Sequence, residues 1–144
     1  MVENVLSTVK REETIVVSLA QCERDIEVIR GDTIFFKVRS IYSDDDYMNL
    51  TTCLLLMAVK EEQTDDDIDA VIKKEIGVGI TVIEELNGFF SVRIDSVDTK
   101  DLEEGVYYYD IRYKHTVTGE VYTIMRGKFI IYAGTNHDLL PWGG

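Results

Sequence analysis

The sequence has little proline, little cysteine and a shortage of positive charge. Its 15 basic residues are scattered among 27 acidic residues, which gives a net charge of −12. A surface that binds nucleic acid needs clustered lysine and arginine, so this charge argues against nucleic-acid binding and disfavours adhesion to anionic membranes. No run of apolar residues is long enough to span a membrane. The N-terminus lacks the basic-then-apolar pattern of a signal peptide, so we expect a protein made and used without Sec export.

The two cysteines, Cys22 and Cys53, have neighbours that form no metal-binding pattern. There is no Cys-x-x-Cys pair, and no histidine lies near either cysteine in the sequence. We therefore expect two reduced thiols in a protein assembled inside the cell. A disulfide between Cys22 and Cys53 is the weaker alternative. Cys53 begins the apolar run CLLLMAV and is expected to be buried.

The residues that are abundant point to β-strands. Hydrophobic residues make up 45% of a chain that is long enough to bury one core. They recur with a period near two, and β-branched and aromatic residues fill the apolar runs. Strands are expected at residues 14–19, 33–42, 50–60, 70–76, 80–84, 89–94, 106–114 and 120–132, and residues 25–29 offer a further short strand. With no long amphipathic helix, the pattern predicts an immunoglobulin-like antiparallel β-sandwich of about seven or eight strands, and a closed barrel is the competing fold.

Turn residues and composition divide the chain further. Asn87-Gly88 is the strongest hairpin signal because both residues tolerate positive φ. We expect an N-terminal arm over residues 1–13, the sandwich over residues 14–132 and a C-terminal tail over residues 133–144. The tail contains the only proline, the only tryptophan and a Leu-Leu pair. An apolar group of this kind is expected to dock on its own domain or on a neighbour.

Three consecutive tyrosines stand in the stretch LEEGVYYYDIRY. Because side chains alternate along a strand, Tyr107 and Tyr109 share one face and Tyr108 points to the other. Tyr107 is placed to form a tyrosine corner, in which the hydroxyl bonds back to the preceding corner of the sandwich. Tyr108 is expected to point outward and to be available to a partner. The alternative is an aromatic ligand platform that Tyr108 would form with Tyr113 or Tyr122.

Other motifs predict no catalytic, cofactor or metal site. The acidic runs at residues 44–46 and 65–69 do not match an EF-hand loop, so solvated loops are expected, with calcium binding as the alternative. His115 and His137 belong to no known nucleophile motif. Gly77-Val78-Gly79 is too short for a phosphate loop. Arg30-Gly31-Asp32 matches the integrin-binding tripeptide but is expected to be a turn before a strand.

An ordered set of short motifs resembles an immunoglobulin-like domain of phage and prophage virion proteins. These motifs are Gly-Asp-Thr before an alternating strand, a Leu-Thr-led strand ending in Val-Lys, an Asp-Thr corner, Leu-x-x-Gly-x-Tyr-x-Tyr-Asp-Ile and Arg-Gly-x-Phe. The residues that match are Gly31, Asp32, Thr33, Leu50, Thr51, Lys60, Asp98, Thr99, Leu102, Gly105, Tyr107, Tyr109, Asp110, Arg126, Gly127 and Phe129. The same pattern is similar to the N-terminal domain of phage baseplate upper proteins. The resemblance covers about residues 25–132.

The resemblance implies a structural part of a virion, in the tail, the baseplate or the head decoration. Such a part is assembled in the cytoplasm of the host bacterium and works by contacts with other virion proteins, commonly as a homo-oligomer. No catalytic residues are implied. Baseplate proteins of this kind continue into long fibre-forming regions, whereas this sequence ends at Gly144, so we expect a small accessory or adaptor subunit.

Four residues are expected to contact partners: Tyr108, Leu139, Leu140 and Trp142. The alternative function is a carbohydrate-binding module, which would need Tyr108, Tyr113 and Trp142 to be exposed as coplanar rings. A third hypothesis, an enzyme, would need a cleft in which acids or histidines converge.

Overall fold

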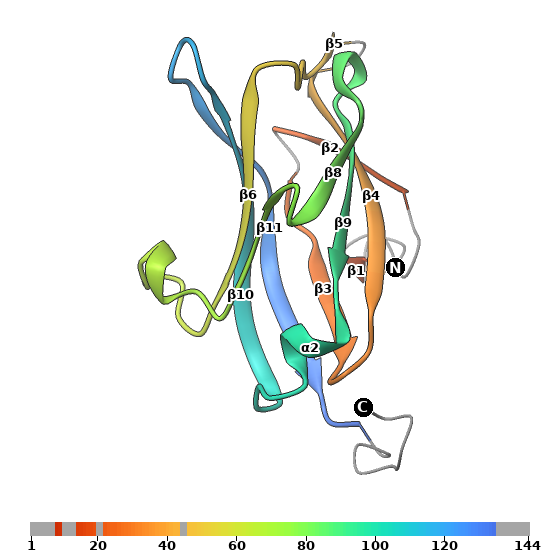
Figure 1. The fold of residues 1–144 in the computed structure, drawn as a ribbon, viewed down its shortest axis with the longest axis vertical. Coiled ribbons are helices and arrows are strands. Elements are labelled where there is room, and N and C mark those ends of the chain that lie inside the picture. Colours follow the sequence, from red (N-terminus) through yellow and green to blue (C-terminus); the bar gives the residue numbers. More distant parts are fainter. Residues whose placement is uncertain (1–7, 10–13, 20–21, 44–45, 135–144) are drawn as a thin grey trace.

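A computed structural model describes residues 8–9, 14–19, 22–43 and 46–134, and Figure 1 shows their arrangement. The strands are β1 (Thr8–Val9), β2 (Thr14–Ser18), β3 (Asp25–Ile29), β4 (Ile34–Ser43), β5 (Asp46–Tyr47), β6 (Cys53–Lys60), β7 (Ile72–Ile76), β8 (Gly79–Glu84), β9 (Phe89–Ile94), β10 (Gly105–His115) and β11 (Val121–Tyr132). Three short helical elements connect them: η1 (Asp67–Asp69), η2 (Glu85–Asn87) and α2 (Ser96–Thr99). None of the helices in these ranges is long and apolar enough to cross a membrane.

The strands form one curled sheet that folds back on itself as two layers. Its strand order is β1-β3-β11-β10-β6-β7-β8-β9-β4-β2, with β5 beside β4. Figure 1 shows β6, β10 and β11 in one layer and β4, β8 and β9 in the other. The sheet passes between layers at β7 and β8, where Gly77 and Gly79 adopt φ of 92° and 90°. Glycine adopts such values without strain, and this permits the sharp change of direction.

The prediction of an immunoglobulin-like β-sandwich is confirmed, but the number of strands is higher than expected. Eleven strands occur in the described ranges, against the seven or eight predicted. The two-residue strands β1 and β5 are too short to show any periodicity in sequence. The sheet is also mixed, since the pairs β1–β3, β3–β11, β2–β4 and β7–β8 are parallel. Alternation along a strand does not show the direction of its neighbour, so the sequence pattern does not predict these parallel pairs.

Two residues of the predicted N-terminal arm lie in the described part of the chain, and they form a strand. β1 lies within residues 1–13 and pairs with the first two residues of β3. β2 begins at Thr14 and β11 ends at Tyr132. Residues 135–144, which make up most of the predicted tail, lie outside the described part of the chain.

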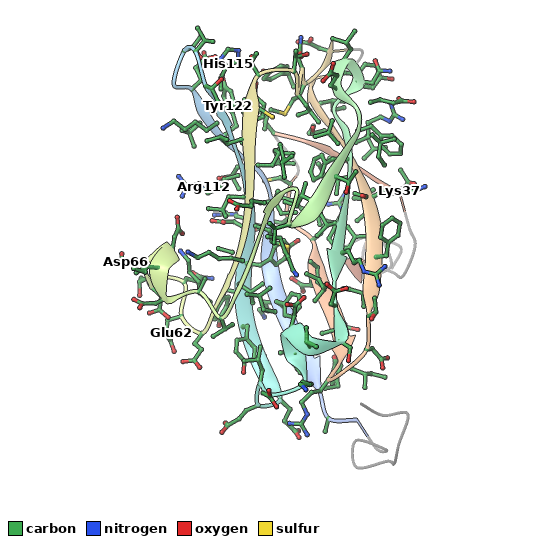
Figure 2. The ribbon with its side chains drawn as sticks, viewed as in Figure 1. Lys37, Glu62, Asp66, Arg112, His115 and Tyr122 are labelled. Carbon is green, nitrogen blue, oxygen red and sulfur yellow. The ribbon has the colours of Figure 1, made fainter. Side chains whose placement is uncertain are left out.

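Side chains that alternate inward from both layers make the core. Phe36, Phe90, Phe129, Met57 and Tyr113 are among its large members and are almost fully buried. Figure 2 shows Lys37 and Arg112 on opposite outer sides of the sandwich, as the alternation of side chains requires.

One expectation about burial needs correction. Cys53, the first residue of β6, is only partly buried. The apolar run forms a strand as predicted, but its first residue lies at the rim of the core.

The β8–β9 hairpin confirms the Asn87-Gly88 signal. The turn contains η2 and closes at Gly88, which has a left-handed φ of 62°. A Cβ atom at Gly88 would lie 2.3 Å from the backbone oxygen of Ser40. The Gly88 position therefore requires glycine both for its backbone angle and for its close contact with β4.

Candidate functional site

The first of the three tyrosines forms the tyrosine corner predicted for it. The Tyr107 hydroxyl donates to the backbone oxygen of Glu103 at 2.8 Å, and the ring is buried. Burial raises the pKa of the Tyr107 phenol, so this hydroxyl keeps its proton and remains a donor. Tyr107 therefore holds the corner that precedes β10 and is not available to a ligand.

The third tyrosine is also structural. The Tyr109 hydroxyl donates to the backbone oxygen of Arg24 at 2.6 Å, across the core. Gly127 lies at the same point, where an added Cβ would come 2.1 Å from that oxygen. Tyr109 and Gly127 thus bring β10 and β11 against the segment that enters β3.

The Gly-Asp-Thr and Asp-Thr motifs meet at one end of the sandwich. The Gly31 backbone N–H donates to the Thr99 hydroxyl at 2.9 Å, and a capping box joins Asp95 and Asp98 at the start of α2. Lys74 is almost buried, and its Nζ lies 2.7 Å from Asp98 Oδ2. These residues fix the corner between the two layers, which explains why both motifs occur together.

Arg30-Gly31-Asp32 is a turn, as predicted. Gly31 has a φ of 89°, and the Asp32 N–H donates to the backbone oxygen of Ile29 at 2.9 Å. The Arg30 guanidinium donates to the backbone oxygen of Leu102 at 3.3 Å. Arg30 is therefore held against the corner rather than presented outward as an adhesive tripeptide would require.

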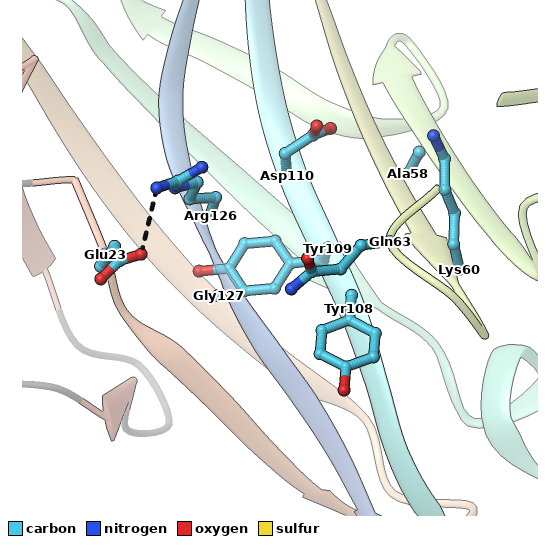
Figure 3. A pocket seen from close by; sticks show the side chains of 9 residues that line it. All are labelled: Glu23, Ala58, Lys60, Gln63, Tyr108, Tyr109, Asp110, Arg126 and Gly127. Atoms are coloured by element: carbon cyan, nitrogen blue, oxygen red, sulfur yellow. Dashed lines mark ion pairs between the residues drawn. The ribbon is translucent and has the colours of Figure 1, made fainter. Parts of the chain in front are cut away.

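A depression on the solvent side of the β6–β10–β11 layer contains the second tyrosine and is the candidate functional site. We call this solvent side the outer face. The depression has a volume of about 330 Å³, and Figure 3 shows the residues around it. They are Glu23, Ala58, Lys60, Gln63, Tyr108, Tyr109, Asp110, Arg126 and Gly127. Tyr108 is half-buried here and lies opposite Lys60 on one side and Lys128 on the other.

Charged groups around the depression are partly paired. Lys60 Nζ lies 2.8 Å from Asp67 Oδ1, and Arg126 pairs with Glu23 at 3.3 Å. The bond from Lys60 holds the pKa of Asp67 below its ordinary value. Both basic groups at the rim therefore already have an acidic neighbour.

Asp110 behaves differently from the other charged residues of the depression. Its carboxylate makes no hydrogen bond or ion pair within the described part of the chain. Burial raises its pKa, although the nearby charges of Arg112 and Lys60 act in the opposite direction. A half-buried carboxylate beside an available tyrosine ring can accept hydrogen bonds from a partner, so the depression is suited to binding polar groups.

The alternative arrangement, an aromatic platform around Tyr108, is not formed. Tyr113 is only 1% exposed, and its hydroxyl donates to the backbone oxygen of Asn49 at 3.2 Å. Tyr122 packs edge-on against Tyr42 with a centroid distance of 5.8 Å. Both rings lie on the core side of the layer, whereas Tyr108 lies on the outer face, so they cannot join it.

The pairing of β6 with β10 places Cys53 directly opposite His115, which sequence reasoning missed. The residues are 62 positions apart, and only the register between the two strands reveals the pairing. Burial raises the pKa of the Cys53 thiol to about 11, and the thiol donates to the backbone oxygen of Leu50. The His115 ring instead contacts Thr52 and accepts from the backbone N–H groups of its own turn. The pair is therefore not arranged as an activated thiol.

Several other predicted site residues can be placed only in part. Within the described residues, no group of three or more His, Cys, Asp or Glu side chains could hold a metal ion. Asp44 and Asp45 of the first acidic run lie outside those residues, and so does His137. The predicted contact residues Leu139, Leu140 and Trp142 also lie outside them, so Tyr108 is the one predicted contact that the structure places.

Comparison with solved structures shows a related fold. The N-terminal domain of phage TP901-1 ORF48 matches with a TM-score of 0.55 and 8% sequence identity, over 85% of this chain and 99% of that domain. The cysteine protease inhibitor EhICP2 from Entamoeba histolytica matches with a TM-score of 0.41 and 9% identity, over 85% of this chain and 99% of the inhibitor. The NK cell receptor Nkp44 also has a TM-score of 0.41, at 12% identity, over 74% of this chain and 95% of the receptor chain. Neither protein-family models nor curated proteins give a match to the sequence. The match to the phage domain thus shows a shared fold.

Proposed function

We propose that this protein is a structural subunit of a phage or prophage virion and acts through protein–protein contacts during assembly. The observation that carries the proposal is the match to the N-terminal domain of a phage protein over nearly the whole of that domain. The ordered motifs of the sequence independently resemble phage virion domains, and the structure explains several of them as parts of one corner.

Within this proposal, the subunit belongs to the tail, the baseplate or the head decoration. The similarity of its motifs to baseplate upper proteins favours the baseplate. The subunit assembles in the host cytoplasm as a homo-oligomer and uses no catalytic chemistry. Tyr108, on the outer face beside Asp110, is its best-placed contact residue, because it combines an apolar ring with a free polar edge.

Purified particles provide the direct test. Particles from a lysate of the phage or prophage that encodes this chain would be banded by density and analysed by quantitative mass spectrometry. We expect the chain to co-purify in a fixed ratio to the other virion proteins, while an abundant host cytoplasmic protein is removed. Absence of the chain from infectious particles would refute the proposal.

The contact role of Tyr108 can be tested in the same particles. Tyr108→Ser removes the ring from the outer face, and we expect fewer copies of the chain per particle. Lys37→Ser is a matched control, because Lys37 lies on the outer side of the other layer (Figure 2). Equal incorporation of both variants would exclude Tyr108 from the assembly contact.

Electron microscopy with a gold-labelled antibody against the chain would show which part of the virion contains it.

A further inference from the structure

The outer face carries an apolar patch at the end of the molecule where the described chain stops. Its members come from three neighbouring strands and are Ile29, Val106, Ile130 and Tyr132. Val106 is paired with Ile130 across β10 and β11, and Tyr132 is paired with Ile29 across β11 and β3. Residues paired in this way present their side chains on the same side of a sheet, so the four are neighbours on the outer face. Glu27 of β3 lies among them, because it is paired with Ile130. We call the four apolar residues the outer patch.

Most of the outer patch is open to solvent in the described structure. Ile29, Val106 and Tyr132 are 48%, 49% and 47% exposed. The Tyr132 hydroxyl donates to Glu27 Oε2 at 3.2 Å, which holds the ring over β3. Single exposed apolar residues are common, but a group of neighbouring ones on a strongly acidic chain indicates a surface that another segment covers.

The segment best placed to cover the outer patch is the remainder of this chain. Tyr132 belongs to the patch, and Gly134 still lies beside it, since an added Cβ there would come 3.6 Å from Ile29 Cγ2. The sequence then continues with the polar stretch Thr-Asn-His-Asp and the apolar group Leu-Leu-Pro-Trp. Asn and Asp favour turns, so a reversal between Gly134 and Leu139 agrees with the sequence.

The available length is sufficient for such a return. Leu139 is five residues beyond Gly134, and an extended chain of that length reaches about 17 Å. Trp142 is eight residues beyond Gly134 and reaches about 27 Å when extended. Neighbouring strands lie about 4.8 Å apart, so crossing from β3 to β10 takes about 10 Å. Both apolar groups can therefore reach the patch without any movement of the sandwich.

We propose that residues 135–144 fold back and place Leu139, Leu140 and Trp142 on the outer patch of the same chain. The sandwich then holds its own C-terminal segment as an apolar cover. Attachment to the same chain gives the segment a high effective concentration, so its own patch is favoured over that of a second copy. This docking does not depend on the virion role, because it uses only contacts within one chain.

Trp142 is the only tryptophan, so its fluorescence reports directly on the docking. In the full chain we expect blue-shifted emission and weak quenching by acrylamide. Val106→Glu places a charge on the β10 side of the patch, and we expect a red shift and at least about a twofold rise in the quenching constant, because a charge opposes apolar contact. Val121→Glu is the matched control: Val121 is 46% exposed, lies opposite Lys114 on the same outer face, and is at the far end of β11. We expect this control to behave as the unaltered chain.

The outcomes distinguish docking of the chain's own C-terminal segment from docking of the segment of a second copy. Equal quenching of Trp142 in the unaltered chain and in a free peptide of residues 135–144 would overturn the proposal. Shielding that disappears on dilution, together with a fall in mass by light scattering, would show that a second copy supplies the segment and would also overturn it. Far-UV circular dichroism checks the fold of Val106→Glu. If that variant is unfolded, Ile29→Glu tests the neighbouring strand of the patch in the same way.

Discussion

At the scale of single residues, the three consecutive tyrosines Tyr107, Tyr108 and Tyr109 are chemically identical but have different structural roles. Tyr107 and Tyr109 point inward, and each hydroxyl satisfies a backbone carbonyl on a different part of the chain. Tyr108 points outward, and its hydroxyl makes no hydrogen bond within the described residues. The reason is the two-residue period of a strand, which sends neighbours to opposite faces.

Replacing these tyrosines with phenylalanine should separate their roles. Tyr107→Phe removes the bond to Glu103 and leaves a carbonyl without its partner, so we expect a loss of about 1 kcal/mol in the free energy of unfolding. Tyr108→Phe removes no internal bond and should change stability by less than about 0.5 kcal/mol. Urea titrations followed by circular dichroism measure both. If the two variants lose equal stability, the corner bond does not contribute as described.

The raised pKa of Asp110 gives a pH dependence of definite sign. The folded chain holds this proton to higher pH than the unfolded chain, so ionisation of Asp110 lowers stability as the pH rises above its ordinary value of 3.8. Asp110→Asn cannot ionise, so we expect it to be more stable than the unaltered chain near neutral pH. The gap should close as the pH falls below about 4.

Melting temperatures across this pH range measure the effect. Asp101→Asn is the control, because Asp101 is exposed in the loop before β10. A stabilisation by Asp110→Asn that persists unchanged at low pH would show that ionisation is not its cause.

At the scale of elements, the junction of β7, β8 and α2 joins the two layers. Lys74 lies on the same side of β7 as the core residue Ile72. The aliphatic part of its side chain packs against Gly79. A Cβ atom at Gly79 would lie only 2.4 Å from Lys74 Cδ, so a larger residue there would displace the lysine. The ammonium group of Lys74 forms an ion pair with Asp98 of α2. A long side chain with an apolar stem and a charged head suits this position, since the stem is buried and the head is paired.

Lys74→Met should therefore weaken the junction. The substitution leaves Asp98 without its cation. We expect a loss of about 2–4 kcal/mol in the free energy of unfolding, as for the removal of one partner of a buried ion pair. The loss is smaller than for a fully buried pair, because Asp98 is partly exposed. Lys73→Met is the matched control, because Lys73 is exposed on the other side of the same strand and should lose less than about 0.5 kcal/mol. Denaturant titrations compare the two. Similar losses from both variants would contradict a structural role for the pair.

At the scale of the whole molecule, strands from the two ends of the chain lie side by side. β3 pairs with β11 in parallel, although about 100 residues separate Ile26 from its partner Phe129. β4 likewise pairs with β9, with Phe36 opposite Val92. The sheet thus closes only when distant segments have met, and no part of it has a core of its own.

This topology predicts slow and cooperative folding. Because most pairings are non-local, we expect refolding in about milliseconds to seconds, as for other all-β domains. Equilibrium unfolding should be two-state, with the same midpoint by circular dichroism and by tyrosine fluorescence. Stopped-flow and equilibrium titrations test this. Separate midpoints for the two probes would show that one layer can unfold without the other.

The sequence by itself determined most of what is local. The positions of the longer strands, the hairpin at Gly88 and the tyrosine corner at Tyr107 could all be read from periodicity and turn chemistry. Such features depend on residues close together in the chain, whose side chains and backbone angles constrain one another directly. For the same reason the sequence alone places Tyr108 on the outer face.

Only the tertiary structure decided which distant strands meet. Cys53 lies opposite His115, and the outer patch joins β3, β10 and β11, through registers that no local pattern specifies. Lys74 is buried in spite of its charge because Asp98 of another element neutralises it. The depression beside Tyr108 likewise takes its walls from β6, β10, β11 and the segment before β3. Pairing between distant segments is fixed by the packing of the whole core, and so it appears only when the complete chain is folded.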